Sequence, residues 1–305
     1  MNLKGNLKRN LKGAFTAMVT PMIDDRLDEQ GLAANIQRQI EAKIEGIVLL
    51  GSTGEDATLT DEEQRRVIEI GVREAKGKTL IIAGTGSNST RKAIEKTKLA
   101  KKWGADLAMV VTPYYNKPTQ EGIYRHFEAI AIEGGLPLIV YNIQGRTGVN
   151  IETSTLLRIA GIPNVVGAKE ASGSVSQAGD VVMKVRGRYP QFSVLCGDDA
   201  LTLPMMAVGA QGIISVVSNL VPERVAALAN AALEERFFEA LAIHQELMPL
   251  FNGAFLETNP MPIKQAMEFC GLPAGKCRLP LCEMRAENQE KLRNILLGMG
   301  LGAGV

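Results

Sequence analysis

The stretch "PLIVYNIQGRTGVNIETSTLLRIAGIPNVVGAKE" (137–170) contains one complete strand–helix–strand unit. It begins with the apolar run 137–142 and ends with a second apolar run, 164–170. Between them, residues 152–160 have the spacing of a short amphipathic helix. Strands that are apolar on both faces are typical of a parallel sheet covered by helices. The stretch therefore predicts two parallel strands joined by a crossover helix.

The same unit recurs along the chain. The apolar runs predict strands at 14–21, 46–50, 79–84, 107–113, 137–142, 164–170, 192–197 and 211–216. Helices are predicted after them at 28–43, from Thr60 onward, and at 89–103, 119–133, 152–160, 174–188, 199–208 and from Pro222 onward. Such a series most simply closes into an α/β fold of the (β/α)₈ or TIM barrel type. An open doubly wound sheet is the alternative, but neither "GSTGED" (51–56) nor "GTGSNS" (84–89) has the glycine spacing of a nucleotide-binding loop.

The order of segments divides the chain into three parts. Residues 1–12 are expected to form a flexible basic leader, and residues 13–233 the barrel. After residue 233 the strand signal stops, and helices are predicted at 234–252, 260–270 and 285–298. Residues 234–305 are therefore predicted to form a C-terminal helical region packed on the barrel.

The composition of the 305 residues excludes several classes of function. A net charge of +1 gives no basic footprint for nucleic acid, and no apolar run is long enough to span a membrane. The four cysteines form no C-x-x-C pair and have only two histidines to assist them, so neither a metal site nor a disulfide framework is predicted. We expect a protein of the reducing cytoplasm.

Lys169 lies where a buried strand should give way to a loop. Strand alternation places Val165, Gly167 and Lys169 on one side, and Gly167 is expected to leave room for the lysine side chain. An amine attacks a carbonyl only when it is deprotonated, and burial in a barrel lowers the pKa of lysine. One hypothesis is therefore an imine-forming lysine. The alternative is a surface lysine paired with the adjacent Glu170.

Other polar residues also follow predicted strands. Tyr141 and Tyr115 could relay protons, or they could pack as amphipathic caps of the core. Ser52 and Thr53 could bind a small carboxylate, or they could only form a turn before the next helix. Arg146 could hold a carboxylate in bidentate fashion, or it could be a solvated loop residue. Because active sites of barrels lie at the carboxyl ends of the strands, their common position favours one site.

Several long motifs occur in a family-specific order: "TAMVTP", "GSTGEDATLT", "AGTGSNST", "VTPYYNKPTQEGIYRHF", "IVYNIQGRTGVN", "VVGAKEASG", "CGDDA", "GIISV" and "NPMPIK". From Gly13 to beyond residue 264, the chain resembles the dihydrodipicolinate synthase/N-acetylneuraminate lyase family. The resemblance implies a (β/α)₈ barrel with C-terminal helices, assembled as a homotetramer of two tight dimers.

The resemblance also implies catalytic roles. Lys169 matches the lysine that forms a Schiff base with pyruvate, and Tyr141 matches the tyrosine that relays protons to and from it. Ser52 stands at a relay position usually held by threonine. Tyr115 matches the tyrosine that completes the relay of a neighbouring subunit.

Binding roles follow from the same resemblance. Thr53 matches the residue that holds the pyruvate carboxylate, and Ile214 matches a residue that lines the pyruvate pocket by its backbone. Arg146 matches the arginine that receives the carboxylate end of the second substrate. No metal or organic cofactor is implied, because the covalent pyruvate imine on Lys169 carries the chemistry.

The implied reaction is the aldol-type condensation of pyruvate with L-aspartate 4-semialdehyde, the step that leads toward diaminopimelate and lysine. Another pyruvate-dependent aldolase or lyase, acting on N-acetylneuraminate or a 2-keto-3-deoxy sugar acid, is the first alternative. Arg146 and the double tyrosine of "PYYNKP" favour the semialdehyde. A non-catalytic barrel used for binding is the second alternative, which the complete set of candidate residues disfavours.

The sequence departs from lysine-inhibited members of the family. Asn88 and Tyr114 of the effector site are retained, but Asp61 and Gln64 stand where some inhibited members have histidines. Lys92 stands where a glutamate would meet the amine of the effector, and like charges repel. Weak or absent inhibition by lysine is therefore predicted.

Overall fold

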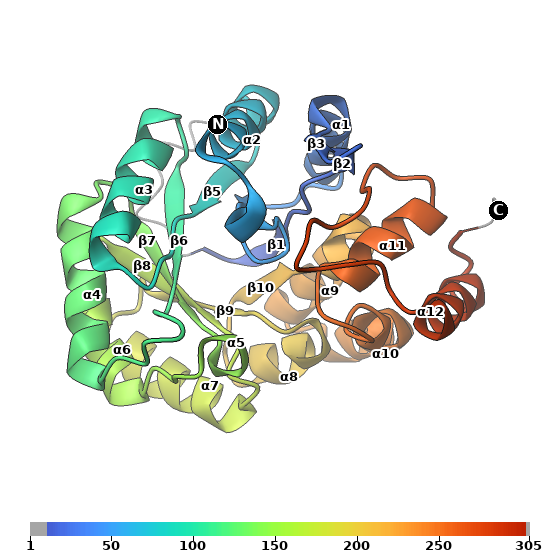
Figure 1. Cartoon of the computed structure of the whole chain (residues 1–305). Coiled ribbons are helices and arrows are strands. Elements are labelled where there is room, and N and C mark those ends of the chain that lie inside the picture. The colour runs from blue at the N-terminus through green and yellow to red at the C-terminus, as the bar shows by residue number, and fades with distance from the viewer. Residues whose placement is uncertain (1–10, 303–305) are drawn as a thin grey trace.

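The computed structural model describes residues 11–302 and has a closed barrel of parallel strands at its centre. Its hydrogen-bonded neighbours follow the order β1-β10-β9-β8-β7-β6-β5-β4 (Figure 1). The barrel strands are β1 (Gly13–Ala17), β4 (Gly46–Leu49), β5 (Leu80–Gly84), β6 (Leu107–Val111), β7 (Leu138–Asn142), β8 (Val165–Glu170), β9 (Ser193–Cys196) and β10 (Gly212–Ser215). The predicted (β/α)₈ barrel is confirmed, and the open doubly wound alternative is wrong.

Helices cover the outside of the barrel, as predicted (Figure 1). They are α1 (Glu29–Glu41), α2 (Asp61–Ala75), α3 (Thr90–Lys102), α4 (Gln120–Glu133), α6 (Thr153–Ala160), α7 (Val175–Val181, continued by a π-helix over Val182–Arg186), α8 (Thr202–Ala207) and α9 (Pro222–Leu233). The sequence shows why α2 begins at its predicted position. The Thr60 hydroxyl accepts a hydrogen bond from the backbone of Glu63, whose carboxylate accepts one from the backbone of Thr60.

Short elements at the barrel mouth were not predicted. They are the hairpin β2 (Met22–Ile23) and β3 (Arg26–Leu27), the helix α5 (Gln144–Thr147), and 3-10 turns at Asp56–Thr58 and Val217–Asn219. The helix predicted at 199–208 begins with a 3-10 turn at Asp199–Leu201 before α8. None of the unpredicted elements is long enough to show a hydrophobic period, so periodicity could not reveal them.

The C-terminal region forms α10 (Phe237–Gly253), α11 (Met261–Phe269) and α12 (Ala286–Gly298). These helices lie together on one flank of the barrel, against α9 and α8 (Figure 1). The connection from α11 to α12 runs back toward the turn after β4 (Figure 1). The C-terminal region therefore reaches the barrel mouth.

The core has an inner and an outer part. Side chains inside the barrel, among them Phe15, Leu107 and Ile214, form one cluster, and a larger cluster lies between the strands and the helices. Leu11, within the predicted leader, is buried in the inner cluster. Residues 1–10 of the predicted leader lie outside the described residues.

One detail of strand alternation was predicted wrongly. The register between β7 and β8 shifts: Leu138 pairs with Val165, but Ile139 pairs with Gly167. This bulge places Val165 in the outer cluster, whereas Val166 packs against the inner one. Alternation from Gly167 onward holds, so Lys169 points into the barrel beside Tyr141, its partner on β7.

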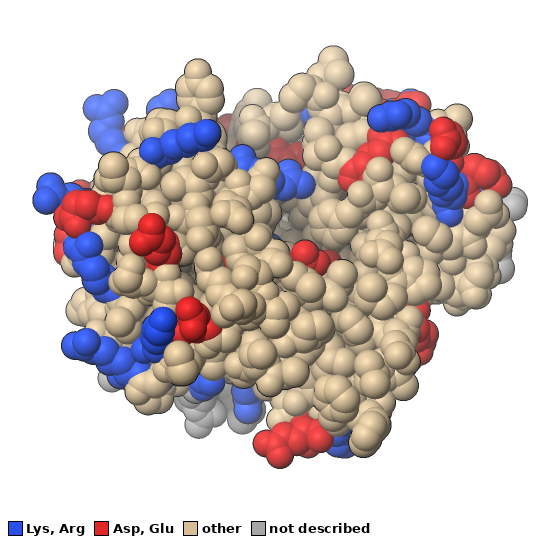
Figure 2. Space-filling view, turned by 90° about the horizontal axis from the view of Figure 1, so that it is seen from below, with Lys and Arg blue, Asp and Glu red and all other residues tan. Residues whose placement is uncertain are grey.

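Charged side chains on the face shown in Figure 2 lie mainly near its margin, with both signs interspersed and uncharged residues over most of the centre. This face therefore has no broad single-sign patch of the kind that binds nucleic acid. Among the described residues, no helix is both long enough and apolar enough to cross a membrane.

Candidate active site

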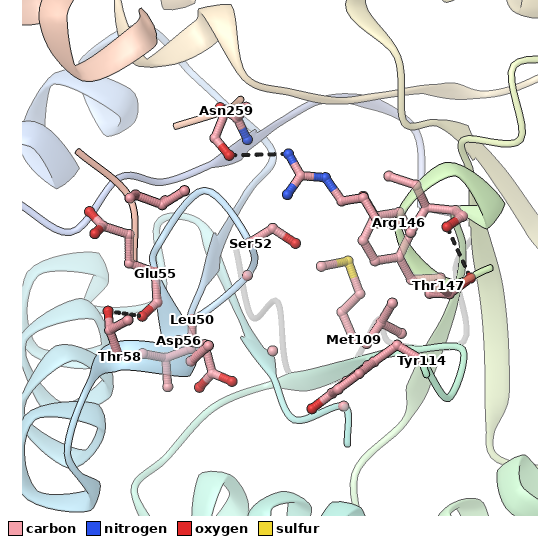
Figure 3. A pocket seen from close by; sticks show the side chains of 18 of the residues that line it. Leu50, Ser52, Glu55, Asp56, Thr58, Met109, Tyr114, Arg146, Thr147 and Asn259 are labelled. Atoms are coloured by element: carbon pink, nitrogen blue, oxygen red, sulfur yellow. Dashed lines mark hydrogen bonds between the residues drawn. The ribbon is translucent and has the colours of Figure 1, made fainter. Parts of the chain in front are cut away.

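A cavity of about 300 Å³ opens at the carboxyl ends of β4, β5, β6 and β7. Ser52, Tyr141 and Arg146, three of the predicted site residues, line it. Asn259, Pro280 and Leu281 of the C-terminal region complete its wall. Figure 3 shows the Ser52 hydroxyl and the Arg146 side chain directed into this space from opposite sides. Side chains that are far apart in the sequence therefore line one cavity at the carboxyl end of the barrel.

Lys169 is the buried amine of the site. Its side chain is 5% exposed, and its Nζ atom lies 4.4 Å from the centre of the Tyr141 ring. Burial lowers the pKa of Lys169 to about 8, an effect that the Asp199 carboxylate opposes and the Arg146 charge assists. A useful fraction of the amine is therefore deprotonated near neutral pH.

The surface alternative for Lys169 is wrong, because Glu170 points to the other side of the strand. The Glu170 carboxylate is buried and accepts hydrogen bonds from Asn142 Nδ2 (3.1 Å) and from the backbone N–H of Ser172 (2.7 Å). Glu170 thus links the end of β7 to the loop after β8.

The glycine that makes room for Lys169 is Gly197, not Gly167. A Cβ atom at Gly197 would lie 2.9 Å from Lys169 Cε and 2.8 Å from Ala171 Cβ. A Cβ atom at Gly167 would instead meet the carbonyl oxygen of Ser193 at 2.7 Å. The prediction for Gly167 failed because the space beside a barrel side chain is set by the neighbouring strand, which local sequence does not reveal.

Tyr141 is also buried, with 6% of its surface exposed. Burial raises the pKa of its phenol to about 12, so the hydroxyl stays protonated and can donate a hydrogen bond or a proton. Ile214 is 1% exposed and belongs to the inner cluster together with Tyr141.

Asn259, which has no role predicted from the sequence, joins Thr53 and Arg146. Asn259 Nδ2 donates to Thr53 Oγ1 (2.9 Å), and Arg146 Nη2 donates to the backbone carbonyl oxygen of Asn259 (3.1 Å), the second contact being drawn in Figure 3. The motif "NPMPIK" contained Asn259, but only folding brings it to the barrel mouth. Both candidate carboxylate-binding residues are therefore held by the C-terminal region.

Asp199 is a second residue of the site with no role predicted from the sequence. Its carboxylate accepts hydrogen bonds from Ser215 Oγ and from the backbone N–H of Val216 (2.9 Å). Burial raises the pKa of Asp199 to about 6, so it is mostly ionised at neutral pH and supports the charged form of Lys169.

Tyr115 is not brought into the cavity of its own chain. It is 90% exposed and has a left-handed backbone conformation, with φ at 72°. Within one chain, Tyr115 therefore faces away from the cavity. The other candidate residues lie at the cavity or next to residues that line it: Lys169, Tyr141, Ser52, Thr53 and Arg146.

Within residues 11–302, no group of three or more His, Cys, Asp or Glu side chains is placed to hold a metal ion. The expected independence from metals and organic cofactors remains a prediction.

A family model described as the dihydrodipicolinate synthetase family matches residues 10–298. The chain belongs to this family. Two curated relatives, both named 4-hydroxy-tetrahydrodipicolinate synthase, come from Protochlamydia amoebophila and Persephonella marina. The first is 53% identical over 88% of this chain and 89% of the relative, and the second is 50% identical over 87% and 90%. The predicted family is confirmed.

Solved structures of the dihydrodipicolinate synthetase family share the fold. A chloride-inhibited dihydrodipicolinate synthase from Acinetobacter baumannii, complexed with pyruvate, has a TM-score of 0.93 and 42% identity, covering 96% of this chain and 100% of that one. An enzyme from Cyanidioschyzon merolae with lysine bound has a TM-score of 0.91 and 37% identity, covering 95% and 98%. Members of this family are lyases of the aldolase type, so the predicted enzyme class is confirmed, and the relatives' names agree with the main predicted function.

Proposed function

We propose that this chain is a 4-hydroxy-tetrahydrodipicolinate synthase, which condenses pyruvate with L-aspartate 4-semialdehyde through an imine on Lys169. The observation that carries the proposal is the buried Lys169 amine, 4.4 Å from the centre of the Tyr141 ring, with its pKa lowered to about 8. An amine that can lose its proton near neutral pH, beside a phenol that keeps its own, is well suited to imine chemistry. Relatives named for this activity, at 47–53% identity, support the choice of substrates.

The first half of the reaction uses pyruvate alone. The Lys169 amine attacks the keto carbon of pyruvate, and loss of water gives the imine. Loss of a proton from the methyl group then gives an enamine. Tyr141 and Ser52 move the protons, together with Tyr115 of a neighbouring copy.

Thr53 is suited to hold the carboxylate of pyruvate, because its oxygen accepts a hydrogen bond from Asn259 and its own O–H remains able to donate one. Ile214 borders the pyruvate from the inner cluster.

The second half adds the semialdehyde. The enamine carbon attacks the aldehyde carbon, and the resulting alkoxide takes a proton from the relay. The amino group of the second substrate then attacks the imine carbon, closes the ring and releases Lys169 as a free amine. Arg146, directed into the cavity, is suited to bind the carboxylate of this substrate. The balance of atoms needs no metal and no organic cofactor.

We also propose that the working protein is a homotetramer in the cytoplasm. The exposed Tyr115 supports assembly, since a relay tyrosine at 90% exposure cannot serve the cavity of its own chain.

A coupled assay tests the proposal. Purified protein receives pyruvate and L-aspartate 4-semialdehyde, and a downstream reductase reports the product through NADPH oxidation. We expect turnover that is lost in Lys169→Ala, with Lys291→Ala as a control at an exposed lysine. Cyanoborohydride should trap pyruvate on Lys169 of the unmodified chain. Trapping without turnover would favour a sister aldolase of the same family, and absence of both would reject the proposal.

A further inference from the structure

Lys264 is a buried cation outside the machinery described above. It lies on α11, and its side chain is 2% exposed. Its Nζ atom lies 2.7 Å from Oε1 of Glu55, whose side chain is 1% exposed. Glu55 belongs to the turn after β4, more than two hundred residues away in the sequence. The C-terminal region and the cavity wall therefore share one fully buried ion pair.

The Lys264 ammonium group uses all three of its donors. Besides Glu55, it donates to the carbonyl oxygens of Lys276 (3.0 Å) and Thr20 (3.2 Å). These acceptors lie in the turn after β4, in the connection between α11 and α12, and in the loop after β1. A single side chain thus ties three segments together at the barrel mouth.

Glu55 is held from its other side as well. Its Oε2 atom accepts a hydrogen bond from the backbone N–H of Arg278 (2.9 Å), and the Thr20 hydroxyl donates to the carbonyl oxygen of Gly54 (2.8 Å). Glu55 has φ at 55°, a left-handed conformation that is costly for a side-chain-bearing residue and persists only when its surroundings impose it. Figure 3 shows Glu55 and Ser52 at the same edge of the cavity.

A buried ion pair is a weak source of stability, because desolvation offsets most of the attraction. Two packed apolar side chains would serve stability as well. Unlike apolar contacts, the Lys264–Glu55 pair forms hydrogen bonds of fixed direction and distance. Glu55 is a near neighbour of Ser52 and Thr53 in the turn after β4, so the pair constrains the backbone of that turn.

We infer that Glu55 and Lys264 are positioning residues, through which the C-terminal region holds the 51–55 turn in the geometry that binds the carboxylate of pyruvate. The inference rests on the proposed function for its substrate, but the contacts that carry it are independent of that function. If it holds, breaking the pair should weaken pyruvate binding without removing the reactive amine.

Three variants test the inference: Lys264→Met, Glu55→Gln and the two combined. Lys291→Met is the matched control, because Lys291 pairs with Glu287 on the exposed face of α12. Amide hydrogen exchange of peptides covering 50–58 should be at least about tenfold faster in the single variants, with peptides from the barrel strands unchanged. The KM for pyruvate should rise at least about tenfold, with kcat lowered by less than about threefold.

The double variant distinguishes an effect on the position of the 51–55 turn from an effect on the stability of the whole protein. It buries no unpaired charge, so we expect its Tm to recover toward that of the unmodified protein while the KM for pyruvate stays high. Should the single variants fail to fold, the double variant alone decides. Unchanged exchange in the 50–58 peptides, or a KM that recovers together with Tm, would overturn the inference. If the unmodified chain does not trap pyruvate, the proposed function fails, and hydrogen exchange still decides whether the pair positions the turn.

Discussion

Burial determines the chemistry of Lys169. An exposed lysine amine is almost entirely protonated at neutral pH, whereas burial here lowers the pKa to about 8. The protonated amine predominates below that pH and cannot attack a carbonyl. We therefore expect the rate of pyruvate trapping by cyanoborohydride to rise through pH 8 and to level off above it. A midpoint near the ordinary lysine value would contradict the assignment.

The Asp199 carboxylate should move that midpoint. Its negative charge favours protonated Lys169, so Asp199→Asn should shift the trapping profile to lower pH. Measuring the trapping rate of Asp199→Asn over the same pH series gives the shift of the midpoint. A profile that stays in place would mean that Asp199 only anchors Ser215 and Val216.

Gly197 leaves space that the Lys169 side chain needs. In Gly197→Ala, the new methyl group would meet Lys169 Cε at 2.9 Å and force the lysine aside. We expect pyruvate trapping to slow at least about tenfold and stability to fall by about 1–3 kcal/mol. Rates and urea unfolding measure the two effects. Gly298→Ala is the control, since nothing lies within 4 Å of its added Cβ; equal effects in both variants would refute the steric argument.

At the scale of the element, the start of α2 is tied to the C-terminal region. Glu63, which caps α2, also accepts from both Nη atoms of Arg278 (2.6 and 2.8 Å). The hydrogen bond from Arg278 lowers the pKa of Glu63 to about 2 from its ordinary 4.5. A depressed carboxyl pKa adds stability above the unfolded value, and that stability is lost as the pH falls from about 4.5 to about 2.

Glu63→Gln should therefore reduce the free energy of unfolding at pH 7 by about 1–3 kcal/mol. The difference from the unmodified protein should shrink below pH 4.5. Urea unfolding at a series of pH values measures it. Glu62→Gln is the control, because its pair with Arg65 is exposed and should contribute less than about 1 kcal/mol. A difference that does not change with pH would show that the ion pair is not its source.

The turn after β4 also bears on inhibition by lysine. Gln64 donates to the carbonyl oxygens of Asp56 and Leu59, and Asp56 is paired with Lys96 at 2.7 Å. These groups are therefore already engaged, and Lys92 adds an exposed positive charge. We expect the enzyme to keep more than about half of its activity at ~1 mM L-lysine.

Lys92→Glu should increase sensitivity to L-lysine, because it replaces repulsion of the effector amine by attraction. Lys98→Glu, at another exposed position of α3, is the control for charge alone. Initial rates over a series of lysine concentrations test both variants. Inhibition of the unmodified enzyme at micromolar lysine would contradict the prediction.

At the scale of the whole molecule, the outward Tyr115 makes one chain incomplete for the proposed relay. The Lys169→Ala and Tyr115→Phe variants should each be at least about 100-fold less active than the unmodified enzyme. A mixed dimer has one site with both residues intact. Random pairing makes half of the dimers mixed, so co-expression of the two variants should restore about a quarter of the original activity.

Analytical ultracentrifugation should accompany the co-expression experiment. We expect an assembly of about four times the 32.8 kDa mass of one chain. No recovery in a mixed assembly would mean that Tyr115 does not complete a neighbour's site. A monomer that is fully active would refute both the assembly and this role of Tyr115.

Much of the architecture could be predicted from the sequence, because alternating apolar runs and helical periods are local properties. The strand ends that carry Lys169 and Tyr141 were predictable for the same reason. The bulge that turns Val165 outward was not, since it depends on the register with β7.

By itself, the sequence determined the (β/α)₈ order, the family and the residue types at the carboxyl ends of the strands. Only the tertiary structure decided what surrounds those residues: Gly197 beside Lys169, Asn259 on Thr53 and Arg146, and Lys264 on Glu55. The reason is physical. A strand or helix is specified by neighbours in the chain, whereas a pKa, a packing gap or a buried ion pair is specified by neighbours in space.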